Sequence, residues 1–434
     1  MAAVVGFGLL LPLALNIGPI ITPSASPSRW DAACVANPVI LKPRSDDESW
    51  LCFYYGNRGG YGDAGGGWAG GEKCFLPTGW CGMATSADGL DWSPVDGAND
   101  DGSIFAPNDN TDAWDGLHVG VGDVVRLRNE TLVMFYLGGS NEPPAFGPAG
   151  IKMRIGRALS EDGGLSWRRD ASPVVDIDPA EGLFASWPRV LTPNGEDGEW
   201  YMTYHAFNGS HWNVYSATSN DQGASWDRQG RVLSPGAEGS FDSSGIGTRA
   251  MCEWRGKWLM CFEGVGGGGP FAGKHRLGVA TSDDQGKTWQ KVTTLDGAAD
   301  PGGPIVEPGG PGAWTEQVVG TPYLLPMEGG ALRLYFCAKT AQTNMSIGCL
   351  ESESGDLAME AWKPLAADMA DDDADARVSA LQAQLDEKTA ENEKLGLKVA
   401  ELTEALSDEI KQKNYHFRKA REFYAELTEL KASS

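Results

Sequence analysis

A short phrase that recurs along the middle of the chain constrains the fold more than any other feature. Its form is Ser-x-Asp-x-Gly-x-Ser/Thr-Trp, and it occurs at 160–167, 219–226 and 282–289. A copy one residue shorter lies at 86–92, and a degenerate copy runs from 352 to 362. A phrase that returns at such a period indicates one supersecondary unit repeated along the chain.

Each copy of the phrase follows the same strand-like segments. Aromatic and β-branched runs such as 132–136 and 200–204 come first, and a second run ends in the Ser of the phrase. Another strand precedes each pair and is opened by a bulky residue, as at Trp30 and Trp114. Runs of this kind, bounded by Gly, Asn and Asp, are typical of strands and turns. Four strands per repeat and five repeats predict an all-β fold, a five-bladed β-propeller over 30–363.

The Asp–turn–Trp phrase resembles the Asp-box of sialidase-like propellers, and five blades resemble the arabinanase, levansucrase and invertase (family 43-like) type of glycoside hydrolase. The resemblance covers the repeats and neither end of the chain. It implies a carbohydrate-active protein that hydrolyses or binds a glycan at an axial pocket. The Asp-box itself we interpret as a structural staple, because its Asp can bond turn N–H groups while its Trp packs between sheets.

Glycosidic hydrolysis needs two carboxyl groups that flank one bond. In the hydrolases that this chain resembles, these carboxylates come from different blades, and acidic residues near the first and second strands are the candidates here. Each of them has a structural alternative, a hydrogen-bonded carboxylate that caps a turn at the start of a blade. Asn37-Pro38 also stands where the resemblance leads us to expect Asp-Pro. The candidate catalytic residues are Asp31, Asp115, Asp123, Asp242, Glu263 and Glu316.

Basic and aromatic residues at matching positions are candidates for substrate binding, because they could hold sugar hydroxyls or a carboxylate or stack on a sugar face. Packing within the propeller is the alternative, above all for Trp187. These candidates are Arg189, His205, Arg249, Trp187 and His118.

The two ends differ from the repeats. Residues 1–29 hold an apolar run and then small residues, which predicts a leader cleaved near 24–26 or a membrane anchor; an apolar segment packed on the domain is the alternative. An acidic linker at 364–376 precedes heptad-spaced apolar residues, which predict a coiled-coil helix at 377–431. A solvated single helix is the alternative, because Lys388, Glu409 and Lys413 also fall on the apolar seam.

Composition excludes several classes of partner and cofactor. Thirty-five Lys and Arg against 59 Asp and Glu give a formal net charge of −24, which argues against nucleic-acid binding. Neither metal-ligand spacing nor a phosphate-binding loop occurs, so we predict no metal and no cofactor. The 8 Cys favour local disulfides, such as Cys252–Cys261 and Cys337–Cys349, in an oxidising compartment; buried thiols are the alternative.

Two functional hypotheses follow. In the first, the chain is a glycoside hydrolase-like enzyme or glycan-binding propeller in the secretory pathway, outside the cell or in a plastid lumen. In the second, it is a non-catalytic assembly subunit that self-associates or binds a helical partner through its C-terminal helix.

Overall fold

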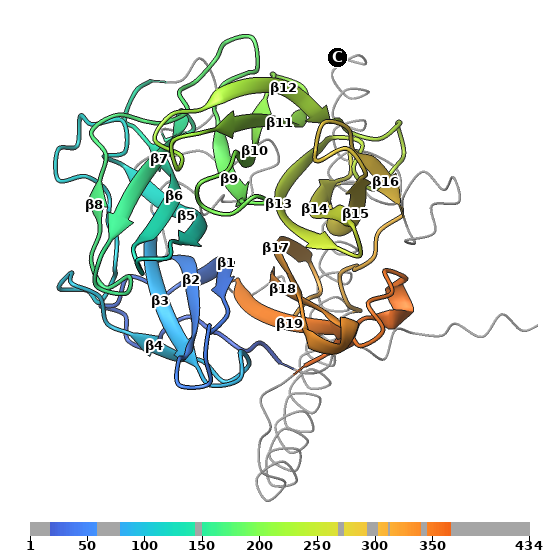
Figure 1. Cartoon of the computed structure of the whole chain (residues 1–434), viewed down its shortest axis with the longest axis horizontal. Helices are drawn as coiled ribbons and strands as arrows, with labels where there is room; N and C mark the ends of the chain where they lie inside the picture. Colours follow the sequence, from blue (N-terminus) through green and yellow to red (C-terminus); the bar gives the residue numbers. More distant parts are fainter. Residues whose placement is uncertain are drawn as a thin grey trace, which may run out of the picture. The chain divides into compact units, whose positions relative to one another are not determined.

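The computed structural model describes residues 18–58, 79–143, 150–267, 273–292, 303–310, 313–339 and 345–365. Twenty β-strands and two single-turn 3-10 helices, η3 (Glu328–Gly330) and η4 (Met359–Ala361), make up their regular structure. The strands form five antiparallel four-stranded units in chain order, which stand around a common axis (Figure 1). The five-bladed propeller predicted from the repeats is therefore confirmed.

The bounds of the strands follow the repeats. Blade 1 contains β1 (Cys34–Leu41), β2 (Trp50–Asn57), β3 (Trp80–Ser86) and β4 (Ser93–Val95). Blade 2 contains β5 (His118–Arg126), β6 (Leu132–Gly139), β7 (Met153–Ser160) and β8 (Arg168–Arg169). Blade 3 contains β9 (Ser186–Leu191), β10 (Trp200–Phe207), β11 (Trp212–Ser219) and β12 (Asp227–Leu233). Blade 4 contains β13 (Gly245–Trp254), β14 (Lys257–Val265), β15 (His275–Ser282) and β16 (Gln290–Val292). Blade 5 contains β17 (Val318–Pro326), β18 (Leu332–Lys339), β19 (Ser346–Ser352) and β20 (Lys363–Pro364).

In blades 1 to 4 the Asp-box fixes the turn between the third and fourth strands and ties the blade to its neighbour around the ring. In blade 3 the Asp221 carboxylate accepts the Ser225 N–H at 2.9 Å. The Trp226 ring then packs edge-on against Phe135 of blade 2, with ring centroids 5.6 Å apart. The first and last blades meet in the same way, because Trp92 of blade 1 packs against Tyr335 of blade 5. This repeated contact explains why the phrase recurs at a constant position in each blade.

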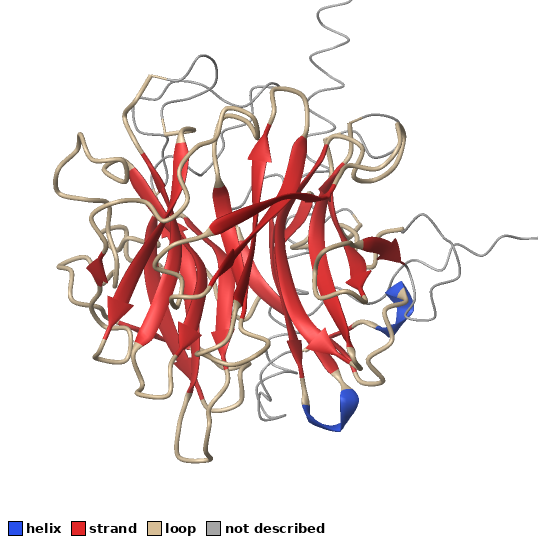
Figure 2. Ribbon diagram, turned by 45° about the horizontal axis from the view of Figure 1, so that its top comes forward, coloured by secondary structure: helices blue, strands red, loops and turns tan. Residues whose placement is uncertain are grey.

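The innermost strand of every blade carries a β-bulge at the same level. The register shifts fall at Ala36/Val39, Val121/Asp123, Ile246/Arg249 and Gly320/Tyr323, and the β9–β10 pair shifts at Thr203/His205. A bulge bends its strand and redirects the neighbouring side chains. Figure 2 shows the strands running from one face of the ring to the other. The five bulges therefore place a small group of side chains on the axis, between the two faces.

The N-terminal segment closes the ring. Ile347 in β19 donates its N–H to the Ile21 carbonyl at 2.9 Å, and Ile20 donates to the Ile347 carbonyl at 2.8 Å. The Ile21 side chain is buried. A segment that precedes blade 1 thus extends the outer edge of blade 5. The predicted cleavage region at 24–26 lies just after this pair in the chain.

One part of the predicted fold class is wrong. The described residues are all β and contain no α-helix, so an α-helical coiled coil is not supported as part of the fold, and 377–431 lies outside the described residues. Apolar spacing suggested the coil, but charges at Lys388, Glu409 and Lys413 would lose hydration in a seam. A coiled-coil partner and membrane attachment are likewise unsupported. No helix among the described residues is long and apolar enough to cross a membrane.

The two predicted disulfides are not formed, because Cys252, Cys261, Cys337 and Cys349 are separate, buried thiols. Strand register accounts for this. Cys252 lies opposite Leu259 rather than Cys261, and Cys337 lies opposite Ile347 rather than Cys349. Burial also raises the pKa of the Cys252 thiol, to about 12. These side chains therefore serve as small apolar core residues.

Candidate functional site

The polar groups at the axial ends of blades 4 and 5 form one connected cluster. Glu263 in β14 accepts hydrogen bonds from the Thr248 hydroxyl in β13 and from His275 Nδ1 at the start of β15. It also accepts the N–H of Thr321 in β17, at 3.1 Å. We name Glu263, His275, Thr248 and Thr321 the axial cluster. It joins three strands of blade 4 to the innermost strand of blade 5.

The Glu263 carboxyl group is ionised in this setting. Burial alone would raise its pKa, but the hydrogen bonds from His275, Thr248 and Thr321 outweigh burial and hold the pKa below its usual value. Three donors to one carboxylate also fix its orientation. The group is therefore an anchored negative charge at the axis.

Local backbone geometry makes room for this carboxylate. A methyl group on Gly320 would lie 2.8 Å from Glu263 Cδ, so only glycine allows the approach. Thr321 has φ 43°, a left-handed conformation that a β-branched residue rarely adopts. Its N–H bonds to Glu263 and to the Thr248 hydroxyl, at 3.0 Å, hold it there. The bulge in β17 thus supplies a main-chain donor to the cluster.

A second group of candidates packs between blades 3 and 4. The His205 ring stacks on Trp187, with centroids 5.2 Å apart, and its Nδ1 accepts a hydrogen bond from Arg249 at 3.1 Å. Burial and the neighbouring Arg249 charge lower the pKa of His205 to about 3, so the imidazole is neutral. Arg249 is itself fully buried and also bonds the Thr203 carbonyl. This group is a satisfied buried network.

Arg189 lies on the axis and bonds to all four other blades. Its guanidinium donates to the Arg249 carbonyl at 2.6 Å and to the Gly122 carbonyl at 2.5 Å. It also donates to Asn37 Oδ1 at 3.2 Å and to the Pro322 carbonyl at 3.4 Å. The residue is only 2% exposed. We conclude that Arg189 fills the centre of the propeller and holds the blades in register.

Asp123 lies in β5 just after the bulge, and its carboxylate accepts the Val190 N–H of blade 3 at 2.7 Å. Burial raises the pKa of Asp123 to about 6, against the lowering influence of Arg189 and the backbone donors. This folded-state pKa exceeds the value of about 3.9 that the group has in the unfolded chain. Asp123 therefore ionises more readily in the unfolded chain, and stability falls as the pH rises between the two values.

We therefore expect the contribution of Asp123 to fall as pH rises from 4 to 6, by at most about 3 kcal/mol. Urea unfolding of the wild type and of Asp123→Asn at pH 4, 5 and 6 measures it. As the pH rises over this range, the unfolding free energy of the wild type should fall relative to that of Asp123→Asn. A pH-independent difference would contradict the assignment.

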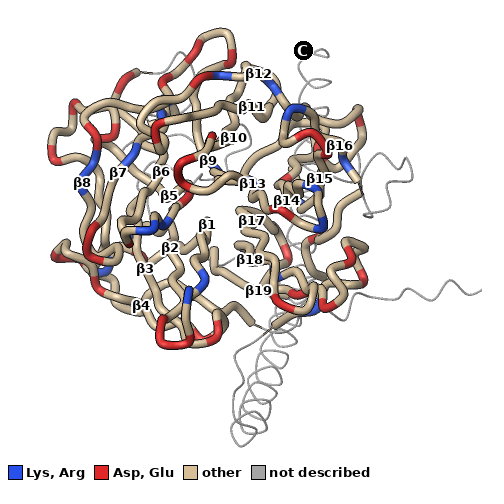
Figure 3. Tube along the Cα trace, in the orientation of Figure 1, with Lys and Arg blue, Asp and Glu red and all other residues tan. Residues whose placement is uncertain are grey.

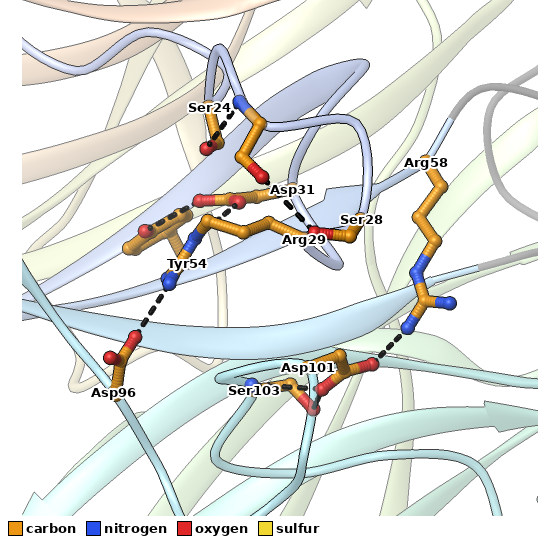
Figure 4. Close-up of polar contacts among 10 residues, drawn as sticks. Ser24, Ser28, Arg29, Asp31, Tyr54, Arg58, Asp96, Asp101 and Ser103 are labelled. Atoms are coloured by element: carbon orange, nitrogen blue, oxygen red, sulfur yellow. Dashed lines mark hydrogen bonds and ion pairs between the residues drawn. The ribbon is translucent and has the colours of Figure 1, made fainter.

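Three candidate carboxylates, Asp115, Asp242 and Asp31, find their hydrogen-bond and ion-pair partners within their own blade or the segment that leads into it. Each of them pairs with a Lys or Arg side chain. Asp115 accepts the Tyr136 hydroxyl at 2.9 Å and Arg169 of β8 at 2.7 Å. Asp242 pairs with Lys291 of β16. Asp31 accepts the Tyr54 hydroxyl at 3.2 Å and lies near Arg29 (Figure 4). The arrangement recurs in blade 3, where Glu181 bonds Tyr204 and pairs with Arg228.

The last two candidates are His118 and Glu316. His118 is fully buried, its Nε2 lies 2.9 Å from the Gly150 carbonyl, and burial lowers its pKa to about 4. Glu316 follows Thr315, and Thr315 rather than Glu316 occupies the position that matches Asp242. The offset arises because blade 5 has Trp314-Thr315 where other blades have an aromatic residue followed by Asp.

A polar pocket of about 550 Å³ lies beside blade 1, and no residue of the axial cluster lines it. Arg29 pairs there with Asp96 at 2.5 Å, and Arg58 pairs with Asp101. Ser28 and loop 96–106 complete the lining, and we name it the rim pocket. Its cations already have carboxylate partners, so we give more weight to the axial cluster. Acidic and basic residues are interspersed around the ring (Figure 3).

Comparisons with known proteins agree with this architecture. The BNR/Asp-box repeat family matches residues 280–291, which include the phrase at 282–289. A solved structure whose name describes a BT0996 RGII complex is similar over 78% of this chain and 92% of its own, with a TM-score of 0.56 and 16% identity. Another, named "Glycoside hydrolase", is similar over 81% and 93%, with a TM-score of 0.55 and 16% identity. The predicted resemblance to glycoside hydrolase propellers is confirmed at the level of the fold.

One sequence relative comes from Mycobacterium tuberculosis and is named "Uncharacterized protein MT1551". It is 25% identical over 247 residues, which are 55% of this chain and 73% of the relative. This similarity therefore supports shared ancestry with a protein whose name states no activity.

Sequence reasoning missed His275, Thr248 and Thr321. One signal could have pointed to them. A group that recurs in most blades, such as the acid of Asp115 and Asp242, belongs to the repeated scaffold, whereas a polar group found in one blade belongs to a unique site. His275 heads β15, where the matching positions of β7 and β11 are Met153 and Trp212.

Proposed function

We propose that this protein is a glycoside hydrolase-like, carbohydrate-active propeller that binds a glycan at the axial cluster. The observation that carries the proposal is the ionised Glu263 carboxylate, fixed by donors from blades 4 and 5 at the axial end of the inner strands. The fold is shared with glycoside hydrolases, and a similar structure bears the name of an RGII complex. Hydroxyl-rich ligands suit such a site, because fixed charges orient hydroxyl groups through hydrogen bonds.

Binding is favoured over hydrolysis by the positions of the candidate carboxylates. Hydrolysis needs two carboxyl groups roughly 5–10 Å apart, one of them protonated. Of the six acidic candidates, only Glu263 belongs to the axial cluster, while Asp31, Asp115 and Asp242 have partners within their blades. Among the described residues, the axial cluster thus contains one carboxylate, Glu263, and this favours recognition of a sugar.

We expect Glu263→Gln to weaken glycan binding about 10-fold or more, because the amide loses the charge and can no longer accept all three hydrogen bonds. The test is a glycan array that includes RGII oligosaccharides, followed by calorimetry with the oligosaccharide that the wild type binds most tightly, here called the reference glycan. Product analysis of the same mixtures detects hydrolysis.

Glu161→Gln is the matched control, since Glu161 is an exposed carboxylate in an Asp-box turn on the opposite face. It should bind the reference glycan as the wild type does. A folded Glu263→Gln protein with unchanged affinity would refute the proposed site, and a wild type that binds no arrayed glycan would refute the proposed function.

A further inference from the structure

We propose that His275 is the residue of the axial cluster that contacts the glycan, and that Glu263 is its positioning residue. The inference rests on the proposed function and deepens it. It names the imidazole Nε2 of His275 as the acceptor of a hydrogen bond from a sugar hydroxyl.

The hydrogen-bonding capacity of Glu263 is largely used within the protein. One carboxylate oxygen accepts His275 Nδ1, and the other accepts the Thr248 hydroxyl and the Thr321 N–H. Its side chain is only 11% exposed. A carboxylate with three internal donors and little exposed surface has little capacity left for a ligand. Direct contact with a sugar is therefore better assigned to a neighbour.

His275 has the complementary properties. Its side chain is 34% exposed, and Nδ1 is committed to Glu263. In a neutral imidazole, a proton on Nδ1 leaves Nε2 with a free lone pair. No described residue forms a hydrogen bond with Nε2. The carboxylate thus selects the tautomer whose acceptor atom is available to a ligand.

The backbone holds this imidazole in place. His275 opens β15, where it pairs with Val265 of β14 and with Val318 at the start of β17. Strand pairing on both sides fixes the Cα position, and the Glu263 hydrogen bond fixes the ring. A preorganised acceptor loses little conformational entropy when a hydroxyl binds.

The chemistry selects hydroxyl donors. A sugar hydroxyl can donate to Nε2, whereas a group that can only accept cannot. The charged groups nearest to His275 in these strands are Glu263 on β14, which bonds it, and Lys274 and Arg276, which flank it in the chain.

The experiment compares His275→Leu, His275→Gln and Glu263→Gln with the wild type, using the reference glycan. We expect His275→Leu to lower affinity at least 10-fold. His275→Gln should retain more affinity than His275→Leu, because its amide oxygen can accept the same hydroxyl. His211→Leu is the matched control, since His211 is an exposed histidine in the β10–β11 turn, and it should leave affinity unchanged.

Nitrogen-15 NMR provides a readout that a merely structural role would not move. The wild type should show an unprotonated Nε2 on His275, and its resonance should shift when the reference glycan is added. Glu263→Gln should redistribute the tautomers of His275 in the absence of any glycan. If the Nε2 resonance of His275 does not shift at saturating concentrations of the reference glycan, the inference is overturned, even if the leucine variant fails to fold.

The two proposals fail in different ways. If Glu263→Gln loses affinity while a folded His275→Leu protein keeps it, the inference about His275 is overturned and the proposed site stands. If the wild type binds no arrayed glycan, both are overturned.

Discussion

Arg189→Met is expected to lower the free energy of unfolding by about 4 kcal/mol or more. The substitution removes a buried guanidinium that donates to the carbonyls of Gly122, Arg249 and Pro322 and to Asn37. Those acceptors lie on four different blades and would be left buried without donors. Loss of one partner from a buried, hydrogen-bonded charge network typically costs about 3–5 kcal/mol.

Denaturant unfolding followed by tryptophan fluorescence measures the effect. Arg231→Met is the matched control, because Arg231 is an exposed residue of β12, and its replacement should change stability by less than about 0.5 kcal/mol. Equal stability of the two variants would contradict the conclusion that Arg189 holds the blades in register.

Removal of the N-terminal closure is expected to have the second large effect. A protein that begins at residue 24 lacks Ile20 and Ile21, and therefore the hydrogen bonds to Ile347 and a buried isoleucine side chain. Loss of a buried Ile costs about 2–5 kcal/mol, and each net hydrogen bond adds about 1 kcal/mol. We expect the protein to be about 4 kcal/mol less stable than one that begins at residue 18.

The comparison between these two starting points isolates residues 18–23, because both proteins lack the preceding segment. The point variant Ile21→Ala in the longer protein should reproduce part of the loss. Coincident unfolding curves for the proteins that begin at 18 and at 24 would show that the β19 contact does not close the ring.

The sequence predicts the blades well because their determinants are local. Ser219, Asp221 and Trp226 lie within one turn, and the Asp side chain bonds the main chain of that same turn. Because these contacts lie within the turn, the turn has the same residue pattern in whichever blade it occurs. Counting these turns and the strands around them gives the number of blades directly.

The roles of the axial residues could not be predicted in the same way, because they depend on contacts between distant segments. Arg189 and Asp242 are both charged residues close to a first strand of their blade in the sequence. In the structure, Arg189 donates hydrogen bonds to carbonyl groups of other blades, whereas Asp242 pairs with Lys291 in its own blade. Their partners are tens of residues away, and the bulges decide which side chains reach the axis.

Whether a polar residue recurs at the same position in several blades helps to separate scaffold residues from site residues, which the hydrophobic pattern alone does not do. Asp115 and Asp242 share one position and one role, with an outer-strand cation as partner. Within the described parts of the blades, a Glu–His pair such as Glu263 and His275 occurs in blade 4 alone, and a single axial site requires such uniqueness. Their pairing still needed coordinates, because Gly264 to Lys274 separate them in the chain.

A crystal structure of the wild type with the reference glycan tests the central claim most directly. We predict a sugar at the axial ends of blades 4 and 5, with one hydroxyl about 3 Å from His275 Nε2 and Glu263 still bonded to His275 Nδ1. A glycan seated instead in the rim pocket against Arg58, with the His275 imidazole free of ligand, would contradict it.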